Sequence, residues 1–176
     1  MADNGNTNER EYDRGDWIVH LYHGTGQIKG VVKKELGGKE KRYYRVKTHN
    51  SVIFIPINKA DNDRIRPLTS KRKFKNALKV LDEPPREMSS NHNTRKATIR
   101  KAKSDGEVKP ILRVIRDLTA RQHESKLNAT EKRALDRLKD RLLYEWAACM
   151  EISVEEAREK LETKLQEMVA ANQAPA

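Results

Sequence analysis

The chain has 176 residues, of which 36% are hydrophobic and 36% are charged, and its formal net charge at pH 7 is +11. These values exclude a large buried core and favour a polyanionic partner, such as nucleic acid, an acidic membrane surface or an acidic protein patch. The one cysteine excludes an intramolecular disulfide, and no apolar run is long enough to cross a bilayer. The first residues lack the apolar segment of a signal peptide, so we expect a cytoplasmic location.

The first part of the chain is predicted to be a tail followed by a β domain. Residues 1–14 are polar and have almost nothing to bury, which predicts a disordered tail. Residues 15–68 contain strand-like segments separated by turns at 36–39 and 48–51. The paired glycines of the first turn supply the positive φ that a tight hairpin requires, and 52–57 is predicted to be a buried strand. Short strands at this spacing predict a small, strongly twisted barrel.

The glycine pair in the segment HGTG, residues 23–26, allows two interpretations. A phosphate-binding loop usually precedes a helix N-terminus, whereas strand sequence with Ile28 and Val31 follows here, so a bent strand or bulge is favoured. His20 and His23 are three residues apart, which on one strand would place them on opposite faces. With one cysteine and no cluster of histidines, neither a metal nor a cofactor is predicted.

From Thr69 the hydrophobic period changes to that of a helix. Phe74, Ala77 and Leu81 have helical spacing after Ser70, which can cap the helix, and two prolines at 84–85 then break the regular pattern. We therefore expect residues 69–91 to be a helix and a linker.

Residues 92–170 are predicted to be an all-α domain. Asn91 or Asn93 can cap a helix that carries Ile99. Three pairs have the spacing of a capping box before an apolar stripe, namely Ser104 with Glu107, Asn128 with Glu131, and Ser153 with Glu156. Cys149 lies in an apolar helical run, which favours a small buried residue over a nucleophile, and no local pattern indicates an enzyme.

Positive charge is concentrated in the middle of the helical part. Residues 92–146 contain 15 Lys or Arg and 8 Asp or Glu, whereas residues 147–176 contain 3 and 6. Such a cluster can neutralise phosphates and release counterions, which predicts salt-sensitive nucleic-acid binding. The alternative is that the cations pair with nearby acids, for example Arg113 with Asp117 and Arg133 with Asp136.

The order of several motifs resembles the CarD/CdnL family of bacterial transcription regulators. The motifs are Gly15-Asp16, YHGTGQI, GGKEKRYYRVK, VIFIP and IRPL, followed by VIRDL and LNATEKRAL in the helical part. The resemblance covers about residues 15–165, and the transcription-repair coupling factor has a similar N-terminal module. It implies an α+β protein, with a small Tudor-like β-barrel that binds the β subunit of bacterial RNA polymerase. A C-terminal helical bundle would then bind promoter double-stranded DNA at the upstream edge of the transcription bubble and modulate the open complex.

The resemblance also implies particular site residues. Lys34 corresponds to a basic position that faces polymerase, and Phe54 replaces a family arginine in the strand that ends at Pro56. The wedge tryptophan of the family falls on His92, which can stack on a base or insert partly into a groove. The other expected DNA-binding residues are Asn91, Arg95, Lys96, Arg100, Lys132 and Arg133.

A second interpretation uses the same charge without polymerase. The chain would then be a general basic adaptor, associated with the nucleoid or the ribosome, and would bind any duplex or RNA equally. In either case we expect a monomer with no membrane partner and no enzymatic activity.

Overall fold

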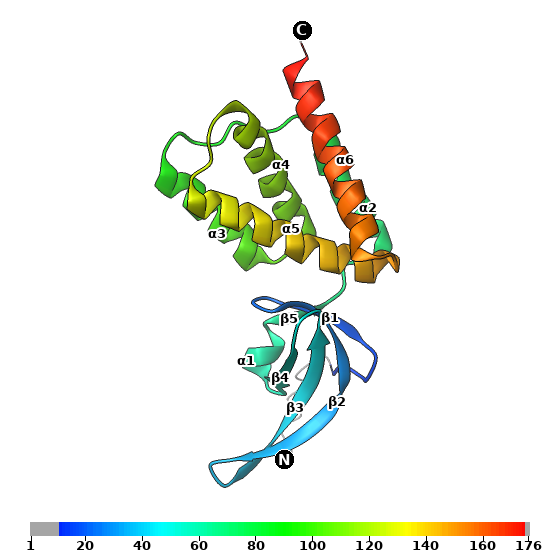
Figure 1. The fold of residues 1–176 in the computed structure, drawn as a ribbon. Helices are drawn as coiled ribbons and strands as arrows, with labels where there is room; N and C mark the ends of the chain where they lie inside the picture. The colour runs from blue at the N-terminus through cyan, green and yellow to red at the C-terminus, as the bar shows by residue number, and fades with distance from the viewer. Residues whose placement is uncertain (1–10, 175–176) are drawn as a thin grey trace, which may run out of the picture. The chain divides into compact units, whose positions relative to one another are not determined.

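In the computed structural model, which describes residues 11–174, one compact unit ends at Leu68 and a second begins at Thr69 (Figure 1). The first contains β1 (Trp17–His20), β2 (Gly24–Leu36), β3 (Lys39–Thr48), β4 (Val52–Pro56), α1 (Lys59–Asn62) and β5 (Ile65–Pro67). The second contains α2 (Lys71–Leu78), the 3-10 helix η1 (Lys79–Asp82), α3 (His92–Asp105), α4 (Val108–Glu124), α5 (Ala129–Met150) and α6 (Val154–Gln173). The predicted α+β class and the order of the two parts are confirmed.

The first unit is one antiparallel sheet with the strand order β4-β3-β2-β1-β5. Tyr44 and Val46 of β3 are buried while Arg45 between them is exposed, as expected for a strand with one face on the core. The apolar face also contains Ile18, Ile28 and Ile55. Because β4 and β5 lie at opposite edges, this Tudor-like sheet is curved but not closed into a barrel.

The glycine-rich part of β2 bends the sheet, as predicted. A Cβ atom on Gly26 would lie 2.6 Å from Cγ1 of Val46, so only glycine lets β2 approach β3 this closely. The pairing with β3 then shifts register between Ile28 and Gly30, which is a β-bulge. The segment therefore continues as a strand and does not lead into a helix.

Two expectations for the β domain were wrong. The rings of His20 and His23 do not lie on opposite faces but are 4.6 Å apart, because residues 21–23 form a turn in which strand alternation does not apply. The segment 52–57 is not a buried strand. It forms the edge strand β4, where Ile55 is buried but Phe54 is 41% exposed.

The structure describes only the last four residues of the predicted tail, residues 11–14. Residues 1–10 lie outside the part of the chain that the structure describes. Within residues 11–14, Tyr12 packs against the sheet: its ring meets that of Tyr44 edge-on at 6.0 Å, and its backbone N–H donates to the Tyr44 hydroxyl at 3.2 Å.

Residues 71–82 belong to the helical unit. Phe74 of α2 lies 5.6 Å from Trp146 of α5, measured between ring centroids, and is fully buried. The backbone N–H and the hydroxyl of Thr69 both donate to the buried carboxylate of Glu145, at 3.1 and 2.8 Å. The thiol of Cys149, buried as predicted, donates to the Thr69 carbonyl at 3.0 Å. The start of this unit is thus bonded to the end of α5.

Most of the predicted helix caps are present. Ser70, Asn91 and Ser153 each accept backbone N–H groups at a helix start, and Asn128 forms a complete capping box with Glu131. The box predicted for Ser104 and Glu107 is wrong. Ser104 lies in the last turn of α3, which ends at Gly106 with φ 67°, and the Glu107 side chain caps nothing.

None of the helices in the described part of the chain is long and apolar enough to span a bilayer.

Candidate functional site

The outer face of β2, β3 and β4 carries an exposed aromatic patch, which we define as Lys34, Arg45, Phe54 and Pro56. Arg45 and Phe54 are direct cross-strand partners, and Pro56 is two residues farther along β4 on the same face. The ammonium of Lys34 lies 3.4 Å from the centroid of the Phe54 ring, a cation–π contact. The structure therefore brings together all three residues that the sequence assigned to polymerase binding.

The ammonium of Lys34 and the ring of Phe54 belong to one surface, which combines an apolar centre with positive charge. An exposed aromatic side chain with cations beside it is a suitable anchor for a protein partner that carries acidic residues. Lys33, next to Lys34, points to the opposite face and pairs with Glu40 at 2.9 Å. Adjacent lysines on β2 thus have different environments.

In the helical unit, the starts of α3 and α5 lie side by side. We call this surface the paired helix starts and define it as residues 91–96 and 128–133. Asn128, the cap of α5, has its side-chain amide 3.1 Å from Nδ1 of His92, the first residue of α3. The partial positive charge of two helix N-termini therefore converges beside an exposed ring, which suits an anion such as a DNA phosphate.

Arg95 lies beneath this surface and holds it together. Its side chain is 8% exposed, and Nε donates to Oε1 of Glu131 at 2.5 Å. Its Nη1 donates to the carbonyls of Ser89 and Ser90 at 2.9 and 2.8 Å. The predicted direct phosphate contact by Arg95 does not fit this arrangement, because the guanidinium is already bonded within the protein. Arg95 is a positioning residue that joins the segment before α3 to the start of α5.

Glu131 is the buried counterpart of Arg95. Burial opposes its ionisation, but the hydrogen bonds from Arg95 and from the Asn128 backbone, with the charges of Arg95 and Arg121, lower its pKa below the usual value. The carboxylate also lies 3.7 Å from Nδ1 of His92. One buried acid therefore links the α5 cap, the positioning arginine and His92.

The remaining expected DNA-binding residues are exposed. His92 has 49% of its side chain accessible, and Asn91 caps α3 by accepting from the N–H groups of Asn93 and Thr94. The exposed cations around the paired helix starts are Lys96, Arg100, Lys132 and Arg133. The structure thus gathers the sequence-predicted positions from two helices and places all but Arg95 at the surface.

Arg116 of α4 is one of the cations of the basic segment 92–146, but it does not lie at the surface. It is fully buried, and its guanidinium donates to Asp117, to Glu83 and to the carbonyl of Val80, at 2.8, 3.2 and 3.1 Å. Asp117 therefore pairs with Arg116 and not with Arg113. No sequence signal marks this role, because Val80 and Glu83 lie more than 30 residues away.

Among the residues that the structure describes, no group of three or more His, Cys, Asp or Glu side chains could hold a metal ion.

Comparison with known proteins covers both units. Residues 12–69 match the family model described as the CarD-like/TRCF RID domain, and residues 76–162 match that of the C-terminal domain of CarD. A protein of Bacillus subtilis (strain 168) named "Putative transcription factor YdeB" is 31% identical over 134 residues, which are 74% of this chain and 87% of the relative.

These matches define the class of protein, a transcription regulator in which a β interaction domain precedes a helical domain. Within that class, the chain belongs to the CarD-like family.

Proposed function

We propose that the protein is a non-enzymatic transcription regulator that binds the β subunit of RNA polymerase through its sheet unit. The aromatic patch is the contact surface in this proposal. The observation that supports it is the packing of Lys34 on Phe54, which presents a cation and an exposed ring together on one face. The match of residues 12–69 to the RID domain model is consistent with a polymerase partner.

We further propose that the helical unit binds promoter double-stranded DNA near the upstream fork of the bubble. His92 would contact the fork, while the exposed Lys96, Arg100, Lys132 and Arg133 would contact phosphates. The convergence of two helix N-termini beside an exposed ring supports this assignment. The same proposal places the protein in the cytoplasm, on the nucleoid, as a monomer.

In this mechanism the protein shifts the melting equilibrium by binding the opened fork more tightly than the closed duplex. A ligand can shift an equilibrium only by the difference between its affinities for the two states. Tethering to polymerase raises the local concentration of the helical unit at the fork, and the contacts at the paired helix starts supply the difference.

The test is the lifetime of open complexes on one promoter, with and without the protein. We expect the protein to change the lifetime, and His92→Trp to enlarge the change about fivefold, because an indole stacks on bases over a larger area at a gain of about 1 kcal/mol. Asn93→Trp, which adds the same ring at the neighbouring exposed position, is the matched control. A wild-type protein that binds any duplex or RNA equally and leaves the lifetime unchanged would instead indicate a general basic adaptor.

A further inference from the structure

A second positive surface lies on α2, outside the paired helix starts. Five of the nine residues from 71 to 79 are cations, all of them are exposed, and none of the nine is acidic. They are Lys71, Arg72, Lys73, Lys75 and Lys79.

Most of these cations form one face of the helix. Lys71, Lys75 and Lys79 are four residues apart, so they lie on successive turns about 6 Å from one another along the helix axis. Phe74 and Ala77 lie on the other side and are buried. The result is a line of charge that follows the helix axis, with Arg72 beside it.

The stability of the helix does not account for this arrangement. Like charges four residues apart repel each other, and three cations in the first turn oppose the helix dipole. Neither effect helps α2 to fold, and the core contact of the helix is made by Phe74. A polyanion bound along this face would relieve both repulsions.

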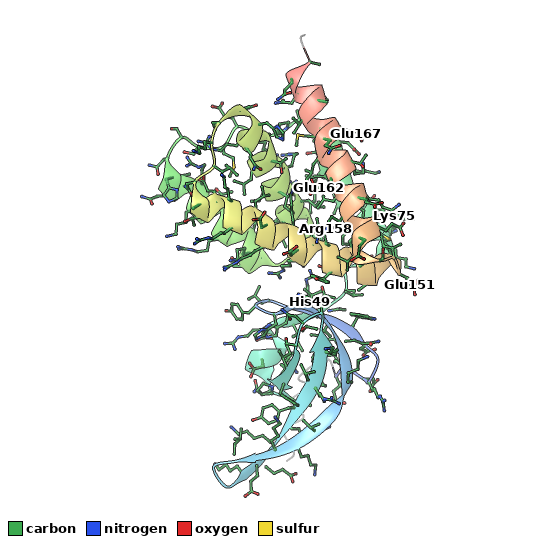
Figure 2. All side chains as sticks on the ribbon, viewed as in Figure 1. His49, Lys75, Glu151, Arg158, Glu162 and Glu167 are labelled. Carbon is green, nitrogen blue, oxygen red and sulfur yellow. The ribbon has the colours of Figure 1, made fainter. Side chains whose placement is uncertain are left out.

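Nearby acids leave most of the α2 cations uncompensated. Glu151 pairs with Lys71 at 2.7 Å. Lys164 pairs with Asp82, the last residue of η1, and Arg116 pairs with Glu83, which follows it. Within the described part of the chain, the other four α2 cations take part in no ion pair. Figure 2 shows Lys75 and Glu151 on the same side of the helical unit.

This surface is distinct from the paired helix starts. α2 packs near the end of α5, where Phe74 meets Trp146, whereas the paired helix starts lie at Asn128. Trp146 is 18 positions after Asn128, which corresponds to roughly 27 Å of helix. Figure 1 shows α5 running across the helical unit between these two regions.

We propose that the exposed face of α2 binds the phosphate backbone of duplex DNA, as a second contact that extends the footprint of the helical unit. This inference rests on the proposed DNA-binding function. A duplex is favoured over an acidic protein because protein interfaces need apolar anchors. The exposed large hydrophobic residues of the described chain all lie in the sheet unit, namely Trp17, Tyr22, Val31, Leu36, Val52 and Phe54. Phosphate contacts need only cations.

The test uses the full chain and a 40-base-pair duplex, with the dissociation constant measured by fluorescence anisotropy at several salt concentrations. We expect Arg72→Gln/Lys75→Gln to reduce the slope of log affinity against log salt by about 2, and to weaken binding roughly ten- to a hundredfold at 0.1 M salt. Arg72→Glu/Lys75→Glu should weaken binding at least as much. The thermal midpoints should not fall, because both side chains are exposed and their replacement relieves repulsion within α2.

The matched control is Arg158→Glu/Lys160→Glu on α6, which changes the net charge as much as Arg72→Glu/Lys75→Glu does but breaks only exposed ion pairs. An equal loss in this control, or an unchanged slope in the α2 variants, would overturn the inference. The inference would also be overturned if the α2 variants bound DNA normally but lost binding to an acidic protein.

Failure of the proposed function gives a different result. If the wild-type protein does not bind the duplex at all, the DNA-binding function itself fails. If it binds, and only the α2 variants are without effect, the second contact alone is wrong.

Discussion

At the scale of single residues, cations that are adjacent in the sequence differ in burial and in their contacts. Arg95 is buried with its guanidinium bonded to Glu131, whereas Lys96 beside it is exposed. In β2, Lys34 packs on Phe54 while Lys33 pairs with Glu40 on the opposite face. The role of a cation in this protein therefore depends on which side of its element it occupies.

Glu131→Gln should destabilise the helical unit in a pH-dependent way. Removing the carboxylate leaves Arg95 buried without its counter-charge, which costs about 3–5 kcal/mol at neutral pH. Because folding lowers the pKa of Glu131, its contribution is complete above the unfolded pKa of about 4.3 and is lost as the pH falls through the folded pKa.

Urea unfolding of wild type and variant from pH 7 to pH 3 measures this difference. The difference between the two free energies of unfolding should be constant near neutral pH and should shrink as the pH falls towards 3. Glu159→Gln, an exposed carboxylate on α6, controls for the loss of one acid. A gap that stays the same down to pH 3 would show that the charge of Glu131 does not matter.

Lys34→Glu should weaken binding to the polymerase β subunit about tenfold or more, because it reverses the charge beside the Phe54 ring. The free energy of unfolding should change by no more than about 0.5 kcal/mol, since the side chain is exposed. Calorimetry with the isolated β lobe measures the affinity. Lys33→Glu makes the same charge change on the opposite face, and an equal loss there would remove the aromatic patch from the interface.

At the scale of secondary-structure elements, two helix N-termini form one surface although their first residues are 37 positions apart. The buried Arg95–Glu131 pair fixes their relative position, and the cap of α5 contacts the first residue of α3. Exposed cations surround these starts without bonding into the core. The charges that hold the two helix starts together are thus buried, and the charges proposed to bind DNA are exposed.

Lys132→Glu/Arg133→Glu should lower the affinity for duplex DNA and reduce the salt slope by about 2, since two phosphate contacts are lost. Folding should be unaffected because both residues are exposed in the first two turns of α5. Anisotropy titrations over a range of salt concentrations measure the slope. An unchanged slope would mean that these side chains do not meet phosphates.

Local signals predicted much of this architecture, and long-range contacts account for most of what was missed. Asn128 with Glu131 forms a capping box that is visible in four residues of sequence. Ser104 with Glu107 has the same spacing, but Gly106 between them ends the preceding helix. The burial of Arg95 could not be predicted, because its partner lies 36 residues away and only the packing of α3 on α5 brings them together.

At the scale of the whole molecule, the connection between the two compact units is short. β5 ends at Pro67, and Thr69 is bonded to Glu145, which leaves Leu68 between two residues held by their own units. A short tether makes the second binding event effectively intramolecular. The proposed mechanism therefore depends on a short connection between the two units.

Inserting six Gly and Ser residues between Leu68 and Thr69 should leave the separate affinities for the β subunit and for duplex DNA unchanged. The effect on open-complex lifetime should fall about two- to tenfold, because a longer flexible tether lowers the effective concentration at the fork. The same insertion in the exposed turn at Gly37 and Gly38 is the control. A full effect on lifetime despite the insertion would show that the two units act independently.

The hydrogen bond from Cys149 to Thr69 offers a chemical reporter for this connection. The protein has a single thiol, it is buried, and burial together with the nearby Glu145 carboxylate raises its pKa, so it resists alkylation while α5 and Thr69 remain joined. The rate at which a maleimide labels the unmodified chain therefore measures how often this junction opens. Comparing that rate for the protein alone and in the proposed complex with polymerase would show whether assembly tightens or loosens the junction, and the experiment needs no introduced cysteine.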